Sequence, residues 1–204
     1  MTDFPFPADE IKNHRFHTLI QGTFELDEHR LRLRTEFGVI GLYPVDHSGN
    51  RALHAGRAHH QESPDAVVFA YGYPRVKDGC IHGMQLCSFH TGDKQPAKDS
   101  VAARFMPGQV FLCGRVKEAT PNGGGPVTVR VKTRIPGAGD RRWDVQAFCL
   151  DHVRKQSKTL FHGWIAEGGK LFLKVEKEIT PPGQKTRRSP VRKGPDRPHR
   201  SLLQ

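Results

Sequence analysis

The stretch from Val127 to Arg134 constrains the fold more than any other part of this sequence, because apolar and polar side chains alternate along its whole length. This period of two predicts an extended strand whose two faces differ. One face carries Val127, Val129, Val131 and Thr133, and the other carries Thr128, Arg130, Lys132 and Arg134. The stretch from His29 to Glu36 repeats the pattern, with Leu31, Leu33 and Thr35 set against Arg30, Arg32 and Arg34. Each strand therefore needs a core on one side and offers a basic face on the other.

The charge of the chain is uneven. The net charge is +11, from 32 Lys and Arg against 21 Asp and Glu, and the apolar content of 36% is enough for a compact core. Residues 180–204 hold seven basic residues and one acidic residue, a net +6, which leaves +5 for the rest of the chain. Because this segment has little to bury, we expect a disordered basic tail in which Arg187 and Arg188 contact phosphates.

Membrane and secretion signals are missing from the sequence. No apolar run approaches the roughly 18 residues that span a bilayer, and the first residues lack the basic and apolar regions of a signal peptide. We therefore expect a cytoplasmic protein with no membrane partner. The four cysteines, Cys80, Cys87, Cys113 and Cys149, are dispersed, and we expect reduced thiols used mainly for packing.

Four predicted hairpins begin with an apolar run that ends in a glycine, at Gly22, Gly72, Gly114 and Gly163. The order is three strands, a break and two strands, followed by the same order again. A glycine inside a first strand is typical of the bend that lets a strand curl around a small barrel. The first break, from Asp46 to Asp65, is polar, and we expect a long loop with one helical turn around residues 51–60.

This strand order and glycine placement look like a tandem of two OB-like five-stranded barrels. The resemblance implies an N-terminal arm at residues 1–15, barrels at 16–90 and 108–179, a connector at 91–107 that could hold a short helix, and the tail at 180–204. A single antiparallel sandwich or barrel would suit the same number of strands. The OB-like arrangement implies a surface, made by the central strand face and the flanking loops, that binds an oligonucleotide or a sugar.

Basic and aromatic side chains on such a surface predict binding of single-stranded DNA or RNA without sequence preference. Cations two residues apart on a strand recur about every 6.8 Å, close to the phosphate repeat of an extended strand, and aromatic rings stack bases. The predicted binding residues are Arg30, Arg32, Arg34, Arg115, Lys117, Arg130, Lys132, Arg134, Phe148, Trp164, Phe172, Arg187 and Arg188. Further candidate platforms are Phe24, Tyr71, Tyr73 and Phe111, and Phe148 faces outward if Trp143 lies in the core. The loop from Thr120 to Pro126 would close over the bound strand.

Other functions stay open at this point. The basic faces could be solvated edge strands, and the chain could be an assembly adaptor whose tail engages an acidic protein. No signature of a nucleotide-binding loop, a nucleophile elbow or a zinc-protease helix is present, so we expect a protein that is not an enzyme and needs no cofactor. Cys80, His82, Cys87 and His90 fall within eleven residues, but their spacing departs from established zinc sites, and we do not predict a metal there. The sequence leaves open DNA versus RNA, sequence specificity, oligomeric state, the pathway, and whether these two cysteines and two histidines bind zinc.

Overall fold

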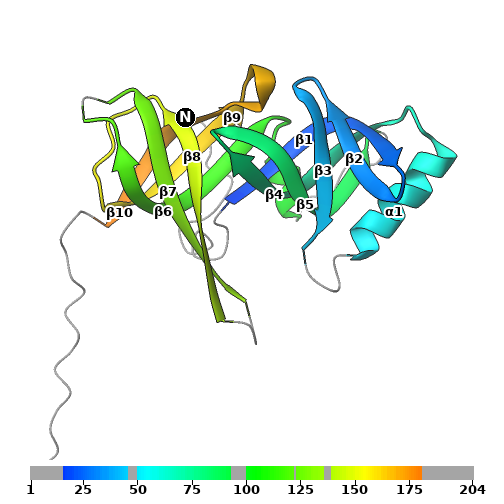
Figure 1. The fold of residues 1–204 in the computed structure, drawn as a ribbon, viewed down its shortest axis with the longest axis horizontal. Coiled ribbons are helices and arrows are strands. Elements are labelled where there is room, and N and C mark those ends of the chain that lie inside the picture. Colours follow the sequence, from blue (N-terminus) through cyan, green and yellow to red (C-terminus); the bar gives the residue numbers. More distant parts are fainter. Residues whose placement is uncertain (1–15, 46–49, 93–99, 122, 136–138, 181–204) are drawn as a thin grey trace, which may run out of the picture.

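The computed structural model of the protein describes residues 16–45, 50–92, 100–121, 123–135 and 139–180, and Figure 1 shows their arrangement. In chain order the strands of the first half are β1 (Phe16–Asp27), β2 (Arg30–Thr35), β3 (Gly38–Pro44), β4 (Val67–Lys77) and β5 (Cys80–Thr91), with helix α1 (Asn50–Glu62) between β3 and β4. The second half contains β6 (Gln109–Ala119), β7 (Gly125–Ile135), β8 (Gly139–Cys149), β9 (Lys158–Ile165) and β10 (Leu171–Thr180). Short 3₁₀ turns, η2 (Val101–Arg104) and η3 (Glu167–Gly169), precede β6 and β10.

The five strands of the first half close on themselves. β1 pairs with β2, β2 with β3, and β4 with both β5 and β1, all antiparallel. A parallel pairing between β3 and β5 completes the ring. The chain is therefore mainly β, as predicted, and these strands form a closed barrel rather than one leaf of a sandwich.

The strands of the second half pair in the same order. β6 pairs with β7, β7 with β8, and β9 with both β10 and β6, and β8 runs parallel to β10. The halves are joined by an antiparallel pairing of β1 with β6, so that all the strands belong to one continuous sheet. A second contact joins Cys80 at the start of β5 to Lys170 beside β10.

The four glycines of the predicted repeat hold matching places in the two halves. A Cβ atom added to Gly22 or Gly114 would collide with the backbone carbonyl of Arg34 or Arg130, on the next strand. A Cβ added to Gly72 or Gly163 would collide in the same way with the carbonyl of Gln85 or Phe172. Only glycine permits this approach of neighbouring backbones, so these four positions give a residue-by-residue alignment of the two halves.

Inward-facing residues follow the predicted alternation. Leu31 and Leu33 of β2 are 2% and 0% exposed, and Val127, Val129 and Val131 of β7 are 3%, 0% and 0% exposed. In the glycine alignment Leu33 corresponds to Val129, so equivalent inward-facing positions fill the interior of each half. The predicted amphipathic strands are confirmed, with apolar residues in the core and basic residues outside.

Different segments cover the equivalent ends of the two interiors. In the first half α1 packs there: Leu53 is buried, and Gly56 lies against Leu31 and Phe24. Figure 1 shows this helix beside β2 and β3 at the end of the molecule. The prediction of a long loop with one helical turn was therefore wrong, because packing on the barrel supports a full helix. In the second half the residues after β8 take this place, with Val153 buried.

A second apolar cluster lies on the outer side of the strands, where the halves meet and the segment around η2 covers them. Phe105, from the segment after η2, packs edge-on against Tyr71 of β4 and Phe111 of β6, with ring centroids 5.5 and 5.1 Å apart. Leu19, Ala102, Cys113 and Leu160 complete the buried part of this cluster. The described part of the predicted connector, residues 100–107, is thus packed against both halves.

Candidate functional site

Three of the predicted binding residues form one row on the surface, in which a half-buried Phe172 lies between two exposed rings. Phe148 of β8 pairs in register with Phe172 of β10, which pairs in register with Trp164 of β9. The ring centroids of Phe148 and Phe172 are 5.6 Å apart, and those of Phe172 and Trp164 are 6.0 Å apart with planes 11° from parallel. Phe148 is 41% exposed and Trp164 is 39% exposed. We call these three residues the aromatic row.

Alternation along each strand turns this row outward. Ala147 and Cys149 flank Phe148 and are buried, and Leu171 and Leu173 do the same on either side of Phe172. The expected outward position of Phe148 is confirmed. The premise that Trp143 lies in the core is wrong, because Trp143 is 37% exposed. β7 and β8 are paired from Gly125 and Cys149 out to Ile135 and Gly139, and Trp143 lies in the distal half of this hairpin.

A group of cations lies further along the same sheet. Arg115 of β6 is in register with Arg130 of β7 on one side and with Lys158 of β9 on the other. Lys117 is close enough to Asp144 to help lower its pKa. We call Arg115, Lys117, Arg130 and Lys158 the cationic cluster. Of these, Lys158 was missed by the sequence prediction, because only the pairing of β6 with β9 brings it beside Arg115.

A carboxylate sits within this cluster. Arg130 donates from Nε and from a terminal nitrogen to the two carboxylate oxygens of Asp144, at 2.8 Å each. This bidentate bond is the main cause that lowers the pKa of Asp144 below its usual value, and Lys117 adds to it. A second carboxylate, Glu118, lies beside the cluster and accepts a hydrogen bond from the Thr128 hydroxyl at 3.4 Å. The four cations therefore outnumber the two neighbouring carboxylates.

The aromatic row and the cationic cluster share the outer face of β7 and β8. Phe148 is paired with Pro126, and Asp144 is paired with Arg130. Four residues separate the two pairs along each strand, which corresponds to about 13 Å. The intervening pair, Thr128 and Gln146, is polar. Beyond Arg130, the exposed Lys132 pairs with the exposed Arg142.

The basic face of the first half is arranged differently. Arg32 forms an ion pair with Asp27, and Arg34 forms one with Glu25, so both are held by carboxylates of β1. β2 and β7 are equivalent strands. In the glycine alignment, however, Arg34 corresponds to Arg130 and Arg32 corresponds to Thr128. The two basic runs are therefore shifted by four residues, and Arg34 and Arg130 are the only cations that they have at a common position.

Several other predicted platforms lie inside the protein. Phe24 is 2% exposed, Phe111 3% and Tyr71 8%, so the role of base platform was wrong for these three. Phe24 faces the barrel interior, while Tyr71 and Phe111 are covered by the segment after η2. Tyr71 contacts Nδ1 of His17 through its hydroxyl at 2.6 Å, and burial raises the pKa of this tyrosine strongly.

The first half has its own version of the aromatic row, which the sequence prediction mostly missed. Tyr43 of β3 pairs in register with Gln85 of β5, and Gln85 pairs with Tyr73 of β4. The glycine alignment matches Gln85 with Phe172 and Tyr73 with Trp164. Tyr43 then corresponds to Phe148. The alternation of Ile40 and Leu42 with Gly41 and Tyr43 was the available signal for an outward-facing Tyr43.

The remaining candidates fall outside this surface or outside the described residues. Cys80, His82, Cys87 and His90 all lie on β5, and no group of three potential ligands arranged for a metal ion occurs in the described ranges. None of the four cysteines, all of which lie in the described ranges, is in a disulfide. Arg30 is exposed on β2. The side chain of Arg134 and the tail residues Arg187 and Arg188 are outside what the structure describes.

The loop between β6 and β7 packs against the chain that follows β8. The Thr120 hydroxyl donates to the carbonyl of Pro126 at 3.3 Å. Gly123 lies beside His152, where an added Cβ atom would be 3.2 Å from the His152 backbone. Gly125 and Pro126 already belong to β7. The loop is therefore shorter than predicted, and its described residues lie beside the end of β8 that carries Phe148.

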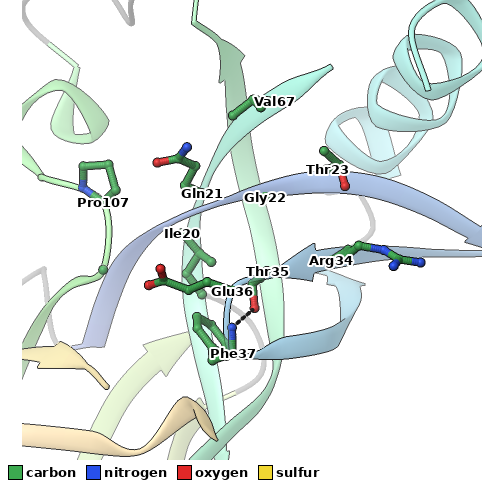
Figure 2. A pocket seen from close by; sticks show the side chains of 11 residues that line it. Ile20, Gln21, Gly22, Thr23, Arg34, Thr35, Glu36, Phe37, Val67 and Pro107 are labelled. Atoms are coloured by element: carbon green, nitrogen blue, oxygen red, sulfur yellow. Dashed lines mark hydrogen bonds between the residues drawn. The ribbon is translucent and has the colours of Figure 1, made fainter. Parts of the chain in front are cut away.

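A cleft of about 360 Å³ opens elsewhere, where β1 passes from pairing with β6 to pairing with β2 (Figure 2). Its walls include Gln21, Thr35, Phe37 and Pro107. In Figure 2 the side chains of Arg34 and Glu36 extend in opposite directions, so these charges do not converge on one point. The cleft shares no residue with the aromatic row or the cationic cluster.

The comparisons assign no family. The chain matches no protein-family model, and a search of curated proteins found no relative. Among the described residues, no helix has the length and apolar character needed to cross a membrane. The geometry of the outer face is therefore the basis for inferring a function.

Proposed function

We propose that this protein binds single-stranded DNA or RNA, without strong sequence preference and without catalysing a reaction, on the outer face of β6, β7, β8, β9 and β10. The observation that carries the proposal is the aromatic row, in which the exposed rings of Phe148 and Trp164 flank the half-buried ring of Phe172. Bases stack on such rings for about 1 to 3 kcal/mol each, whatever their sequence. The cationic cluster, about 13 Å along the same strands, would contact the phosphates.

The strand order supports the same proposal. A meander of three strands, a closing hairpin and a parallel contact between the third and fifth strands support an OB-like description of each half. In OB-like barrels the face of the second and third strands binds oligonucleotides. β7 and β8 are the second and third strands of the second half, and they carry Phe148, Arg130 and the polar pair between them.

The first test is the affinity for a fluorescent oligothymidylate, measured by anisotropy. The Phe148→Ala, Trp164→Ala double variant should bind at least about tenfold more weakly, because two stacking platforms are lost. Val39→Ala is the matched control, since Val39 is 47% exposed on the outer face of β3, and it should bind normally. Normal binding by the double variant would contradict the proposal.

A salt series tests the cationic cluster separately. Affinity should fall steeply as the salt concentration rises. A plot of the logarithm of the association constant against the logarithm of the salt concentration should have a slope of about −0.7 for each phosphate neutralised. The Arg115→Ser, Lys158→Ser variant should bind more weakly and with a shallower slope. If deletion of residues 180–204 abolishes oligonucleotide binding while the aromatic variant binds normally, the tail rather than the strand face binds the nucleic acid.

The protein offers a direct spectroscopic signal for stacking. It contains two tryptophans, Trp143 and Trp164. In a Trp143→Phe variant, Trp164 is the only tryptophan, and its fluorescence should be quenched on titration with oligothymidylate. In the converse Trp164→Phe variant, the fluorescence of Trp143 should respond much less, because alternation along β8 turns Trp143 to the face opposite to Phe148.

A further inference from the structure

We infer that the first half carries a second site for a nucleobase, built on the ring of Tyr43 and the guanidinium of Arg75. The inference rests on the proposed function, because it names a second place where the same polymer is held. It concerns residues that take no part in the aromatic row or the cationic cluster.

Two glycines create the seat for the Tyr43 ring. Gly41 of β3 and Gly83 of β5 are directly paired across the parallel strands. A Cβ atom added at Gly41 would lie 2.9 Å from the Tyr43 hydroxyl oxygen, and one added at Gly83 would lie 2.8 Å from a ring carbon. The ring therefore leans back along β3 and covers both glycines. Side chains at these two positions would hold the ring off the sheet.

A cation covers the other side of this ring. Arg75 of β4 is paired with Gly83, and its guanidinium carbon lies 3.9 Å from the centroid of the Tyr43 ring. Arg75 is exposed, so its flexible side chain is able to move away from the ring. A planar base that slides between them would stack on the ring on one side and on the planar guanidinium on the other.

The neighbouring residues suit a base with polar edges. Gln85 is in register with Tyr43 and offers an amide, whose nitrogen donates to the Pro44 carbonyl at 3.2 Å. Tyr73 is in register with Gln85 on the other side and contacts the ring of His17, with centroids 4.7 Å apart. In the second half the equivalent positions are purely aromatic. The first half thus pairs one stacking platform with groups that form hydrogen bonds.

Both sites belong to one continuous sheet, and the inference requires that a long polymer spans them. In Figure 1, β3 of the first half and β7 and β8 of the second half are in the foreground. A short oligonucleotide would occupy the aromatic row alone, whereas a longer one would extend to Tyr43. The second site should therefore contribute to the binding of long strands and leave the binding of short ones unchanged.

The test compares Tyr43→Leu with the wild-type chain on oligothymidylates of about 4 and about 16 nucleotides, the range of site sizes for one barrel. We expect affinity for the long strand to fall about tenfold, the loss of one stacking platform, and affinity for the short strand to stay the same. Arg75→Leu should act in the same direction. Gly41→Ala, which keeps the ring but displaces it, should reproduce the effect, and thermal unfolding checks that each variant is folded.

The outcomes separate this inference from the proposed function. If the Phe148→Ala, Trp164→Ala variant loses binding while the Tyr43, Arg75 and Gly41 variants bind long strands normally, the second site is refuted and the proposed function stands. If the Tyr43 variant loses binding while the aromatic-row variant does not, the proposed function fails and the Tyr43 site is the main one. Photocrosslinking of a halogenated uracil in the long strand should label Tyr43. Crosslinks at other residues and none at Tyr43 would also overturn the inference.

Discussion

Phe148, Phe172 and Trp164 in the second half occupy the places that Tyr43, Gln85 and Tyr73 occupy in the first. The strand pairings that carry the two rows are the same, down to the parallel contact of the third and fifth strands. Inward residues also match in character, with Leu33 set against Val129. The fold thus fixes the inside of each half and leaves the outward positions free to differ, and the chemistry proposed for the protein lies in those differences.

The two halves also differ in how their cations are used. In the first, Arg32 and Arg34 are held by Asp27 and Glu25 of the adjacent strand. In the second, Asp144 holds Arg130 while Arg115, Lys117 and Lys158 bring further positive charge. A run of arginines is therefore a poor measure of an anion-binding surface unless the carboxylates on neighbouring strands are known.

The largest expected effect tests whether the two halves are built alike. Gly72→Ala and Gly163→Ala should each destabilise the protein by about 3 kcal/mol or more, because the new Cβ would collide with a backbone carbonyl that cannot move freely. Urea unfolding measures the loss. The control is Gly92→Ala, since nothing lies within 4 Å of a Cβ built there. A large effect at one glycine and none at the other would break the equivalence of the two halves.

The next effect tests the difference between the two rows by exchanging their middle residues. Phe172→Gln copies the first half into the second and should weaken oligonucleotide binding about tenfold, as expected for one lost platform. Gln85→Phe copies the second half into the first, placing a ring between Tyr43 and Tyr73, and should strengthen binding to long strands. Anisotropy on folded variants measures both. If both exchanges leave affinity unchanged, the chemical difference between the rows has no bearing on binding.

The sequence predicted the strands and their faces well, because both depend on local alternation. The glycines at 22, 72, 114 and 163 indicated the repeat, although the reason expected for them was a bend of the strand. The structure shows close approach of neighbouring backbones at these positions. The outward position of Phe148 followed from the same alternation. That it meets Phe172 and Trp164 did not, because the parallel pairing of β8 with β10 brings together residues distant in sequence.

The failures have tertiary causes. α1 contains three histidines and has weak periodicity, and it is helical where Leu53 and Gly56 pack on the barrel. Tyr71 and Phe111 face outward from their strands but are covered by a segment that lies outside the sheet. The ion pairs of Arg34 and Arg130 depend on strand register, which alternation alone leaves open.

The smallest expected effect concerns Asp144, which neutralises Arg130 in the second half. Asp144→Asn removes the carboxylate and releases the guanidinium, so affinity for oligothymidylate at low salt should rise severalfold, with little change in thermal stability because the pair is exposed. Protonation should act in the same direction. The pKa of Asp144 is lowered by Arg130, so the pair is present at neutral pH and is lost only as the pH falls below the usual aspartate range and through this depressed value.

Two controls decide how this result bears on the comparison of the halves. Glu25→Gln, at the carboxylate that holds Arg34, should leave binding of short strands unchanged, since the first half takes no part in it. In an Arg130→Ala background, Asp144→Asn should raise affinity much less, because there is no guanidinium to release. An equal rise in affinity from Glu25→Gln and Asp144→Asn would mean that affinity follows net charge alone. The cationic cluster would then not be a specific binding site.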